Sequence, residues 1–319
     1  MAANAVKAGR APREWTDYGF FGPGSPTWKV WTAPTALLGF QRSVVLEHFD
    51  PFLAAAVADS AGIYTDPRGR LDRTLAYFLT VAVADSRTAI EASEILMRVH
   101  AKVTGIEPLS GKRYNANNPE SQLWIHVTGW HSVLKCYEMF GPGPLSPGEE
   151  QRYWDECVVA AELQTCKPAD VPRSREQVRE YYAAVRPRLL SSERAEKAMH
   201  YLLRTPRKDS NWTIWAGSRV MARATIATLP KWMRTLGHFD QPAVVSRGLV
   251  GPGRIASRVV GGRAGRLAAL RLYAPSTGRL MAQHLDRGIP ALPETVTPAR
   301  ARDLYGAAAR QQAETLIRT

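Results

Sequence analysis

Clearly marked helix starts constrain the fold of this chain more than any other feature of its sequence. Asn118-Pro119-Glu120 supplies a capping side chain, a proline at the first helical position and an acid in the first turn. Ser146 and Ser174 each precede a Glu or Gln by three residues, which is the spacing of a capping box. These signals predict helices that begin near residues 119, 147 and 175.

Apolar residues with a helical period continue between these starts. The expected helices cover residues 35–47, 51–61, 71–104, 119–140, 147–165, 175–186, 192–204 and 213–228. The run 71–104 is longer than a usual globular helix, so we expect a break near Asp85-Ser86. Alternation with a period of two is confined to a short stretch near 242–246, where a strand stays possible. The pattern therefore predicts an all-α protein.

The two ends of the chain differ in composition from its middle. Residues 1–35 are rich in Gly, Pro and Trp, which favours an extended arm that packs its aromatic side chains on the body. Residues 36–240 form the expected helical core. Residues 241–319 form a basic helical extension of the same domain, and the segment Gln241 to Leu285 contains no acidic residue. Leu267–Tyr273 is one expected helix of this extension.

The charge of the chain indicates an anionic partner but does not identify it. The 319 residues are 45% hydrophobic and carry a formal net charge of +13. The basic residues of the extension are Arg247, Arg254, Arg258, Arg263, Arg266, Arg271 and Arg279. They form either a solvated basic face or a surface for lipid or nucleic acid. No RNP strand, zinc finger or helix-turn-helix pattern supports a specific nucleic-acid partner.

The N-terminus and the cysteines indicate the cellular compartment of the protein. The first fifteen residues lack the apolar segment of a secretory signal, and the longest apolar stretch is far shorter than the roughly 20 residues of a bilayer span. Cys136, Cys157 and Cys166 supply neither a disulfide framework nor a CxxC zinc pair. We expect a cytoplasmic protein with at most peripheral membrane contact.

The sequence lacks the characteristic motifs of several enzyme classes. The glycine-rich segments 248–253 and 261–265 follow no expected strand and lack a GK[ST] ending, so they do not support a phosphate-binding loop. No GxSxG elbow and no HExxH helix occurs. The sequence therefore gives no support to conventional serine hydrolase or metalloprotease chemistry.

His100 lies on the apolar side of the expected helix 71–104, flanked by Val99 and Val103 and one turn from Thr104. An imidazole at such a position is desolvated, which favours the neutral form that binds metals. A core histidine bonded to a backbone carbonyl is the alternative.

A cluster of hydrogen-bond donors stands earlier on the same helix. Arg70, Arg73 and Thr74 occupy positions i, i+3 and i+4, with Tyr77 one turn further on. Such a cluster can hold carboxylates or polarise a bound oxygen species, or it can be the solvated start of an amphipathic helix. His126, two turns into the next expected helix, is a further candidate, and a packed core histidine is again the alternative.

Five motifs follow one another in a fixed order along the chain. They are GRLxRT at 69–74, RVHxxVxG at 98–105, YxAxxP at 114–119, WIHxT at 124–128 and LSxxExxxYxxE at 145–156. Their order and spacing resemble the oxygenase MpaB family, which includes the bacterial latex-clearing rubber oxygenases and a fungal prenyl-cleaving oxygenase. The resemblance covers about residues 40–205 and extends more loosely to Leu229–Arg234.

This resemblance implies a globin-reminiscent helical bundle that encloses a haem b pocket. In rubber oxygenases the iron is held by a histidine whose motif matches the segment around His100, so His100 is the expected metal ligand. Arg70 and His126 are expected at the haem, and Thr104 and Tyr77, each one turn from a motif residue, complete the expected cofactor contacts.

The same resemblance assigns Arg73 and Thr74 a catalytic role on the distal side. Arg73 stands where the rubber oxygenases have lysine. Because a guanidinium keeps its proton, it is a poor iron ligand, and the sixth iron position is expected to be open or filled by water.

The expected function is thus a haem-dependent oxygenase of an apolar or prenylated small molecule, with dioxygen or peroxide as oxidant and an electron donor as a further partner. Oxidative cleavage of a double bond is the reaction that the resemblance implies. The alternatives are a haem carrier or sensor without turnover, and a cofactor-free basic helical protein that binds nucleic acid or a membrane.

Overall fold

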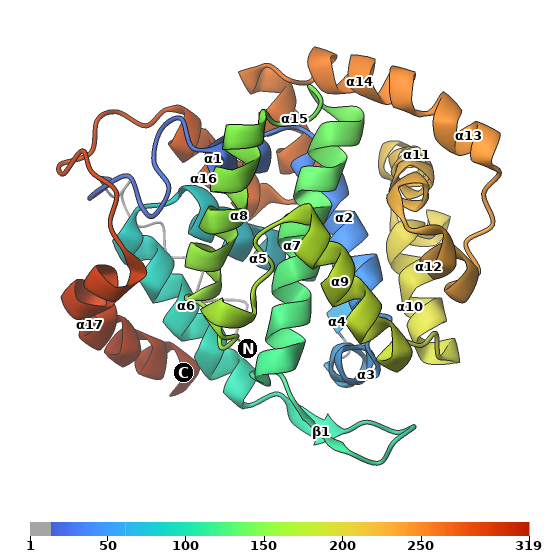
Figure 1. Ribbon diagram of the computed structural model, residues 1–319, viewed down its shortest axis with the longest axis horizontal. Coiled ribbons are helices and arrows are strands. Elements are labelled where there is room, and N and C mark those ends of the chain that lie inside the picture. Colours follow the sequence, from blue (N-terminus) through green and yellow to red (C-terminus); the bar gives the residue numbers. More distant parts are fainter. Residues whose placement is uncertain (1–13, 61, 319) are drawn as a thin grey trace.

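The computed structural model describes residues 14–60 and 62–318 and is built almost entirely of helices (Figure 1). The longer helices are α2 (Ala36–Glu47), α5 (Pro67–Val83), α6 (Ser86–Ala101), α7 (Pro119–Phe140), α8 (Pro147–Ala161), α11 (Trp212–Thr228) and α17 (Pro298–Arg318). The shorter helices are α1 (Pro26–Trp31), α3 (Pro51–Asp59), α4 (Gly62–Thr65), α9 (Arg175–Val185), α10 (Glu193–Leu203), α12 (Lys231–Leu236), α13 (Ala243–Gly248), α14 (Val250–Val259), α15 (Arg263–Tyr273) and α16 (Pro275–Leu285). The predicted all-α class is confirmed. Among the described residues, no helix has the length and apolar character that crossing a membrane requires.

The capping residues act as the sequence indicates. The Asn118 side chain accepts hydrogen bonds at the start of α7, and Ser146 and Glu149 form a reciprocal capping box at the start of α8. Asp85 accepts from the backbone N–H of Thr88 at 3.0 Å and begins α6. The predicted break near Asp85-Ser86 is therefore confirmed.

Two local expectations are wrong. The helix that carries His100 ends at Ala101, because the chain then turns into strand β1 (Thr104–Ile106), which pairs antiparallel with β2 (Arg113–Asn115). The stretch 242–246, where a strand was possible, instead enters helix α13, since its proline fits the position before a first helical turn.

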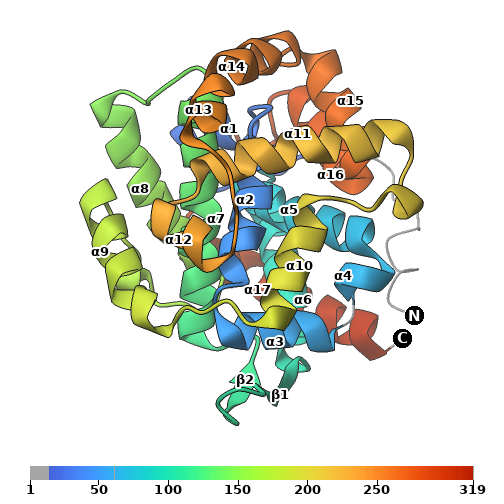
Figure 2. The ribbon, with the colours of Figure 1, turned by 90° about the vertical axis from the view of Figure 1, so that its right-hand side faces the viewer.

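The contact between α2 and α7 forms the centre of the bundle (Figures 1 and 2). A Cβ atom on Gly39 would lie 2.5 Å from the Cα of Val133, so the two backbones meet more closely than any side chain allows. Arg42 is buried in the same contact and donates to the Ser132 hydroxyl at 2.6 Å. This close approach fixes which residues of the two helices face each other.

The segment before α2 packs against the body. Buried Asp17 accepts from the backbone N–H and the hydroxyl of Ser86 at 2.8 and 2.6 Å, which ties this segment to the start of α6. Trp31 stacks on Phe78 with 5.7 Å between the ring centroids and meets Trp130 edge-on at 5.1 Å. Residues 1–13 of the expected arm lie outside the described residues.

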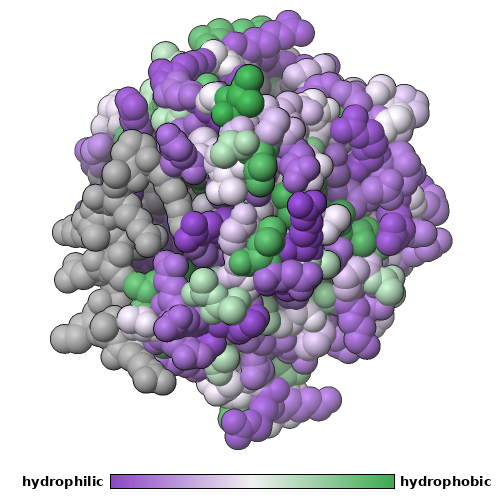
Figure 3. All heavy atoms as spheres, turned by 90° about the vertical axis from the view of Figure 1, so that its left-hand side faces the viewer, coloured by the Kyte–Doolittle hydropathy of each residue, from purple (hydrophilic) through white to green (hydrophobic). Residues whose placement is uncertain are grey.

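The C-terminal helices pack on α5 and α6. Buried Asp72 accepts from the backbone N–H groups of Ser276 and Thr277, both at 2.8 Å, and so supplies the missing cap of α16. Helix α17 lies along α6 (Figure 1), where Arg98 and Glu314 form an ion pair of 2.8 Å. The face of the molecule on this side is mostly hydrophilic, with isolated hydrophobic patches (Figure 3).

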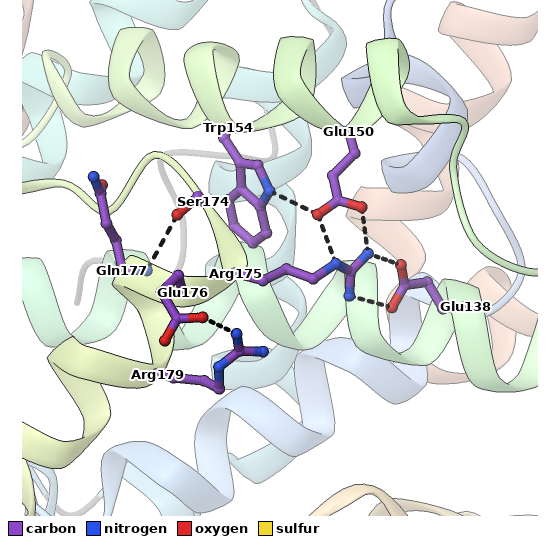
Figure 4. A network of polar contacts seen from close by, with 8 residues as sticks. All are labelled: Glu138, Glu150, Trp154, Ser174, Arg175, Glu176, Gln177 and Arg179. Atoms are coloured by element: carbon purple, nitrogen blue, oxygen red, sulfur yellow. Dashed lines mark hydrogen bonds and ion pairs between the residues drawn. The ribbon is translucent and has the colours of Figure 1, made fainter.

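Arg175 at the start of α9 joins three helices (Figure 4). Its guanidinium donates to Glu138 of α7 at 3.1 Å and to Glu150 of α8 at 2.8 Å. The Glu138 side chain is only 10% exposed, so this carboxylate depends on the cation beside it. Arg179 and Glu176, one turn along α9, form an ion pair on the exposed surface instead.

Replacing Arg175 tests this junction. We expect Arg175→Ala to lower the free energy of unfolding by about 2 kcal/mol, because Glu138 stays buried without its cation. The matched variant Arg179→Ala removes an exposed pair and should cost about 0.5 kcal/mol or less. Urea denaturation followed by far-UV circular dichroism measures both. Equal losses for the two variants would contradict the role of Arg175.

Candidate functional site

Helices α2, α5, α6 and α7 lie together in the middle of the molecule (Figures 1 and 2), and each contributes polar residues that lie near those of its neighbours. Glu47 and His48 lie at the end of α2, Arg70 on α5, His100 on α6 and Gln122 in the first turns of α7. The charge of Arg70 influences the ionisation of Glu47, His48 and His100 alike, which places these groups near one another. We refer to these five residues as the polar cluster.

Glu47 is a carboxylic acid in a poorly solvated place. Burial raises the pKa of Glu47 to about 7, against the opposing effects of a 2.5 Å hydrogen bond from the Ser43 hydroxyl and of the Arg70 charge. Part of its surface nevertheless stays accessible to solvent. An acid with this pKa can both release and take up a proton near neutral pH.

His48 has the hydrogen-bond arrangement typical of a histidine metal ligand. Its Nδ1 lies 2.6 Å from the carbonyl oxygen of Val44, and only a protonated Nδ1 can donate there. The lone pair is therefore on Nε2, which is buried and has no hydrogen-bond partner among the described residues. Burial, with a further contribution from the Arg70 charge, lowers the pKa of His48 to about 4, so the ring is neutral.

His100 is partly buried and also neutral. Burial, followed by the charge of Arg70, lowers its pKa. Its Nδ1 lies 3.4 Å from Nε2 of Gln122, and this amide nitrogen also donates to the carbonyl of Ala116 at 2.6 Å. The amide thus presents a donor to Nδ1 and leaves the proton on Nε2 of the imidazole. Metal binding through Nε2 requires that proton to move and the amide of Gln122 to turn.

Two expected neighbours of His100 do not lie where the sequence pattern predicts them. Val99 is exposed rather than part of the apolar side, because α6 presents that residue to solvent. Thr104 is not one helical turn from His100, since α6 ends at Ala101, and its side chain is exposed in β1.

The donors of α5 lie on one side of that helix but differ in burial. Arg70 is partly buried in the polar cluster, and burial raises the pKa of Tyr77 to about 12. Arg73 and Thr74 are exposed. Arg73 donates to Asp66 at 3.0 Å, and the Thr74 hydroxyl donates back to the carbonyl of Arg70 at 2.9 Å. The structure thus brings Arg70, but not Arg73 or Thr74, to the polar cluster.

His126 occupies a separate, fully buried position between α7 and α8. Its Nε2 lies 2.8 Å from the carbonyl oxygen of Cys157, so this nitrogen carries the proton. Nδ1 is buried and has no hydrogen-bond partner among the described residues. Burial lowers the pKa of His126 to about 4. The contact with Cys157 is the hydrogen bond expected of a packed core histidine.

An apolar cavity of about 50 Å³ lies on the other side of α5. Leu75 and Leu79 line it from α5, Met281 lines it from α16, and Arg266 also lines it. Because Leu75 and Leu79 are roughly 140° and 180° around the helix from Arg70, this cavity is distinct from the polar cluster.

The donor set of the polar cluster fits iron that is already held by a macrocycle. Among residues 14–60 and 62–318, no group of three or more His, Cys, Asp or Glu side chains could hold a metal ion. A haem iron needs only one or two protein ligands, and His48 and His100 are both neutral imidazoles. Arg70 supplies a fixed positive charge of the kind that binds carboxylates.

Glu47 and His48 were not singled out from the sequence. A histidine at a helix end carries no motif of its own, and only the fold shows that α2 ends beside Arg70.

A family model described as "ER-bound oxygenase mpaB/B'/Rubber oxygenase, catalytic domain" matches residues 28–259. The match covers well over half of the chain and includes the polar cluster and His126. No curated protein and no solved structure matches the chain.

His126 should make the stability of the fold depend on pH. The unfolded imidazole titrates near about 6.5 and the folded one at about 4, so the unfolded state binds the additional proton between these values. Stability that is fully present above pH 6.5 is then lost as the pH falls towards 4. From pH 7 to pH 5, this single group should remove about 2 kcal/mol.

Urea denaturation at the two pH values, for wild type and His126→Gln, measures this effect. The variant should lose about 2 kcal/mol less on acidification. Cys157→Ala keeps the carbonyl partner and should behave like wild type. If His126→Gln shows the wild-type pH dependence, the folded imidazole is not held neutral.

Proposed function

Because this chain belongs to the ER-bound oxygenase mpaB/B'/rubber oxygenase catalytic-domain family, we propose that it is a haem-dependent oxygenase of an apolar small molecule. An oxygenase acts on a substrate and an oxidant, here dioxygen or peroxide. The observation that carries the proposal is the convergence of two neutral imidazoles, one guanidinium and one acid inside the matched region.

His100 is the proposed iron ligand. Its lowered pKa supports this role, because the neutral imidazole is the ligating form. His48 offers a second imidazole nitrogen with a free lone pair. Arg70 is proposed to bind the carboxylate groups of the haem, and Tyr77 and His126 to contact its edge. Thr104 is left out of the proposal because it is exposed in β1.

The residues of the chain orient the reactants and handle protons. A bound haem supplies the oxidation chemistry that protein side chains lack. Glu47, whose pKa is about 7, can deliver or accept a proton at its carboxylate oxygen. Arg73 and Thr74 are the proposed hydrogen-bond donors to oxygen, and Arg73 must leave Asp66 to act there. Cleavage of a carbon–carbon double bond is the proposed reaction class.

A haem carrier or sensor without turnover is the second candidate function. The exposed positions of Arg73 and Thr74 favour it, because neither donor reaches the polar cluster in the structure. Oxygen consumption in the presence of a reductant and an alkene separates the two functions.

His100 gives the first test. Wild-type protein expressed with sufficient haem should show a Soret band, and His100→Ala should lose stoichiometric haem while its far-UV circular dichroism stays helical. His238→Asn replaces a histidine that is exposed on the surface and should keep the cofactor. If His100→Ala retains haem and His48→Ala loses it, the iron ligand is His48.

Arg73 gives the second test. Arg73→Ala should bind haem normally but lower kcat by about a hundredfold, because one oriented donor is removed. Arg68→Ala, an exposed arginine in the same part of α5, is the matched control and should keep the wild-type rate. An unchanged rate for Arg73→Ala would remove this residue from the catalytic groups.

A further inference from the structure

The rotation of α14 on the body is fixed by two of its residues. A Cβ atom on Gly253 would lie 2.5 Å from a ring carbon of Phe140, so only glycine fits against the end of α7. Arg254 donates from its guanidinium to the carbonyl oxygens of Met139 and Glu138, at 3.1 and 3.3 Å. These contacts close the C-terminal end of α7 and determine which face of α14 points outwards.

The outward face of α14 is apolar. Ile255 lies about 200° around the helix from Gly253, and Val259 follows one turn later on the same face. Their side chains are 63% and 78% exposed, and Val244 on the preceding helix α13 is 74% exposed. No residue of α13 or α14 is buried. The contacts of Gly253 and Arg254 therefore hold an apolar strip in contact with solvent.

Arginines line one edge of this strip. Helix α13 continues into α14 through Leu249, which has helical φ and ψ. Arg247, Arg254 and Arg258 fall within about 40° of one another around this continuous axis. The guanidinium groups of Arg247 and Arg258 have no hydrogen-bond or ion-pair partner among the described residues. No acidic residue lies between Gln241 and Leu285 to neutralise them.

Three of the other arginines of the extension have partners within the fold: Arg279 donates to the Ser276 hydroxyl, and the two others are Arg263 and Arg266. Arg263 forms an ion pair with Asp286, and Arg266 donates to the carbonyl oxygens of Gly261 and Thr32. Arginines without a side-chain partner among the described residues are therefore concentrated on the edge of α13 and α14, and Arg271 on α15 is a further one.

We propose that the outward face of α13 and α14 binds the surface of an anionic phospholipid bilayer. Lipid phosphates accept hydrogen bonds from the arginine edge, while Ile255 and Val259 enter the boundary between headgroups and acyl chains. A nucleic acid would use only the arginines and leave the apolar strip in water. A second copy of the chain carries the same net charge of +13, so pairing two of these faces would bring like charges together. This inference does not depend on the proposed oxygenase function.

The position of these helices suits contact with a flat surface. In Figures 1 and 2, α13 and α14 run along one outer edge of the molecule. A planar bilayer can therefore reach both the arginine edge and the apolar strip.

Vesicle flotation with the full chain tests the proposal. Wild type should bind phosphatidylcholine vesicles that contain about 30% phosphatidylserine, and its partition coefficient should fall about tenfold in about 0.5 M salt. Ile255→Ser/Val259→Ser should lower this coefficient about tenfold or more. Arg247→Gln/Arg258→Gln should remove the preference for anionic over neutral vesicles.

The β1–β2 hairpin provides a matched control at the opposite end of the molecule (Figures 1 and 2). Ile106 and Leu109 are exposed there, so Ile106→Ser/Leu109→Ser removes comparable apolar surface and should leave binding unchanged. The proposal is overturned if wild type does not bind anionic vesicles, or if only the hairpin variant loses binding. It is equally overturned if Ile255→Ser/Val259→Ser binds like wild type.

Two other partners give distinguishable results. Binding to duplex DNA or RNA without binding to vesicles, weakened only by the arginine variant, identifies a nucleic-acid surface and overturns the proposal. A dimer in sedimentation experiments that Ile255→Ser/Val259→Ser dissociates identifies a protein interface and also overturns it.

A fluorescent label gives a readout that does not depend on partitioning. The three native cysteines are buried, so a polarity-sensitive dye can be attached at Val259→Cys. Its emission should shift to shorter wavelength with anionic vesicles, while the same dye at Ile106→Cys should not respond. A response at Ile106→Cys alone would overturn the proposed orientation.

Discussion

The approach of α2 to α7 at Gly39 is the contact on which the rest of the structure depends. The two helices run antiparallel. Gly39 lies against Val133, while the hydroxyl of Ser43, one turn later, lies 3.8 Å from a Cβ atom built on Gly129, one turn earlier. One further turn brings the end of α2 level with the beginning of α7. Glu47 and His48 are thereby delivered to the end of the bundle where Gln122 contacts His100. A side chain at position 39 would separate the helices and move both halves of the polar cluster apart.

The electrostatics of the polar cluster explain why it suits an anionic ligand. Arg70 is a partly buried cation whose neighbours His48 and His100 avoid repulsion by staying neutral. Glu47 is the nearby counter-charge, yet its pKa of about 7 means that it is ionised only part of the time at neutral pH. The cluster therefore alternates between neutral and positive. A bound group that carries carboxylates would balance Arg70 at less cost than ionising the buried Glu47.

The sequence predicts the features that depend on hydrogen bonds over a few residues. Asn118 and Asp85 cap helices within three residues of themselves, so their positions can be read without the fold. The pattern also indicates that His100 and His126 leave bulk solvent. It fails at Thr104, because pairing with a second strand ends the helix early. His48 could not be identified in this way. Its neighbour Arg70 is far away in the sequence and is brought near only by tertiary packing.

The sequence could not predict the rotation of α14 either, because this rotation depends on a contact with Phe140 at the far end of α7. Helix α7 also sets the distance between the polar cluster and the proposed membrane-binding face of α14. Gln122 stands near its start and Phe140 at its last residue, so at 1.5 Å per residue they are separated by about 27 Å along the axis. A bilayer that contacts α14 at one end of α7 therefore leaves the polar cluster near the other end. Membrane binding through α13 and α14 would thus hold the protein close to apolar molecules without placing the polar cluster in the lipid, and an apolar substrate would have to leave the bilayer to reach it.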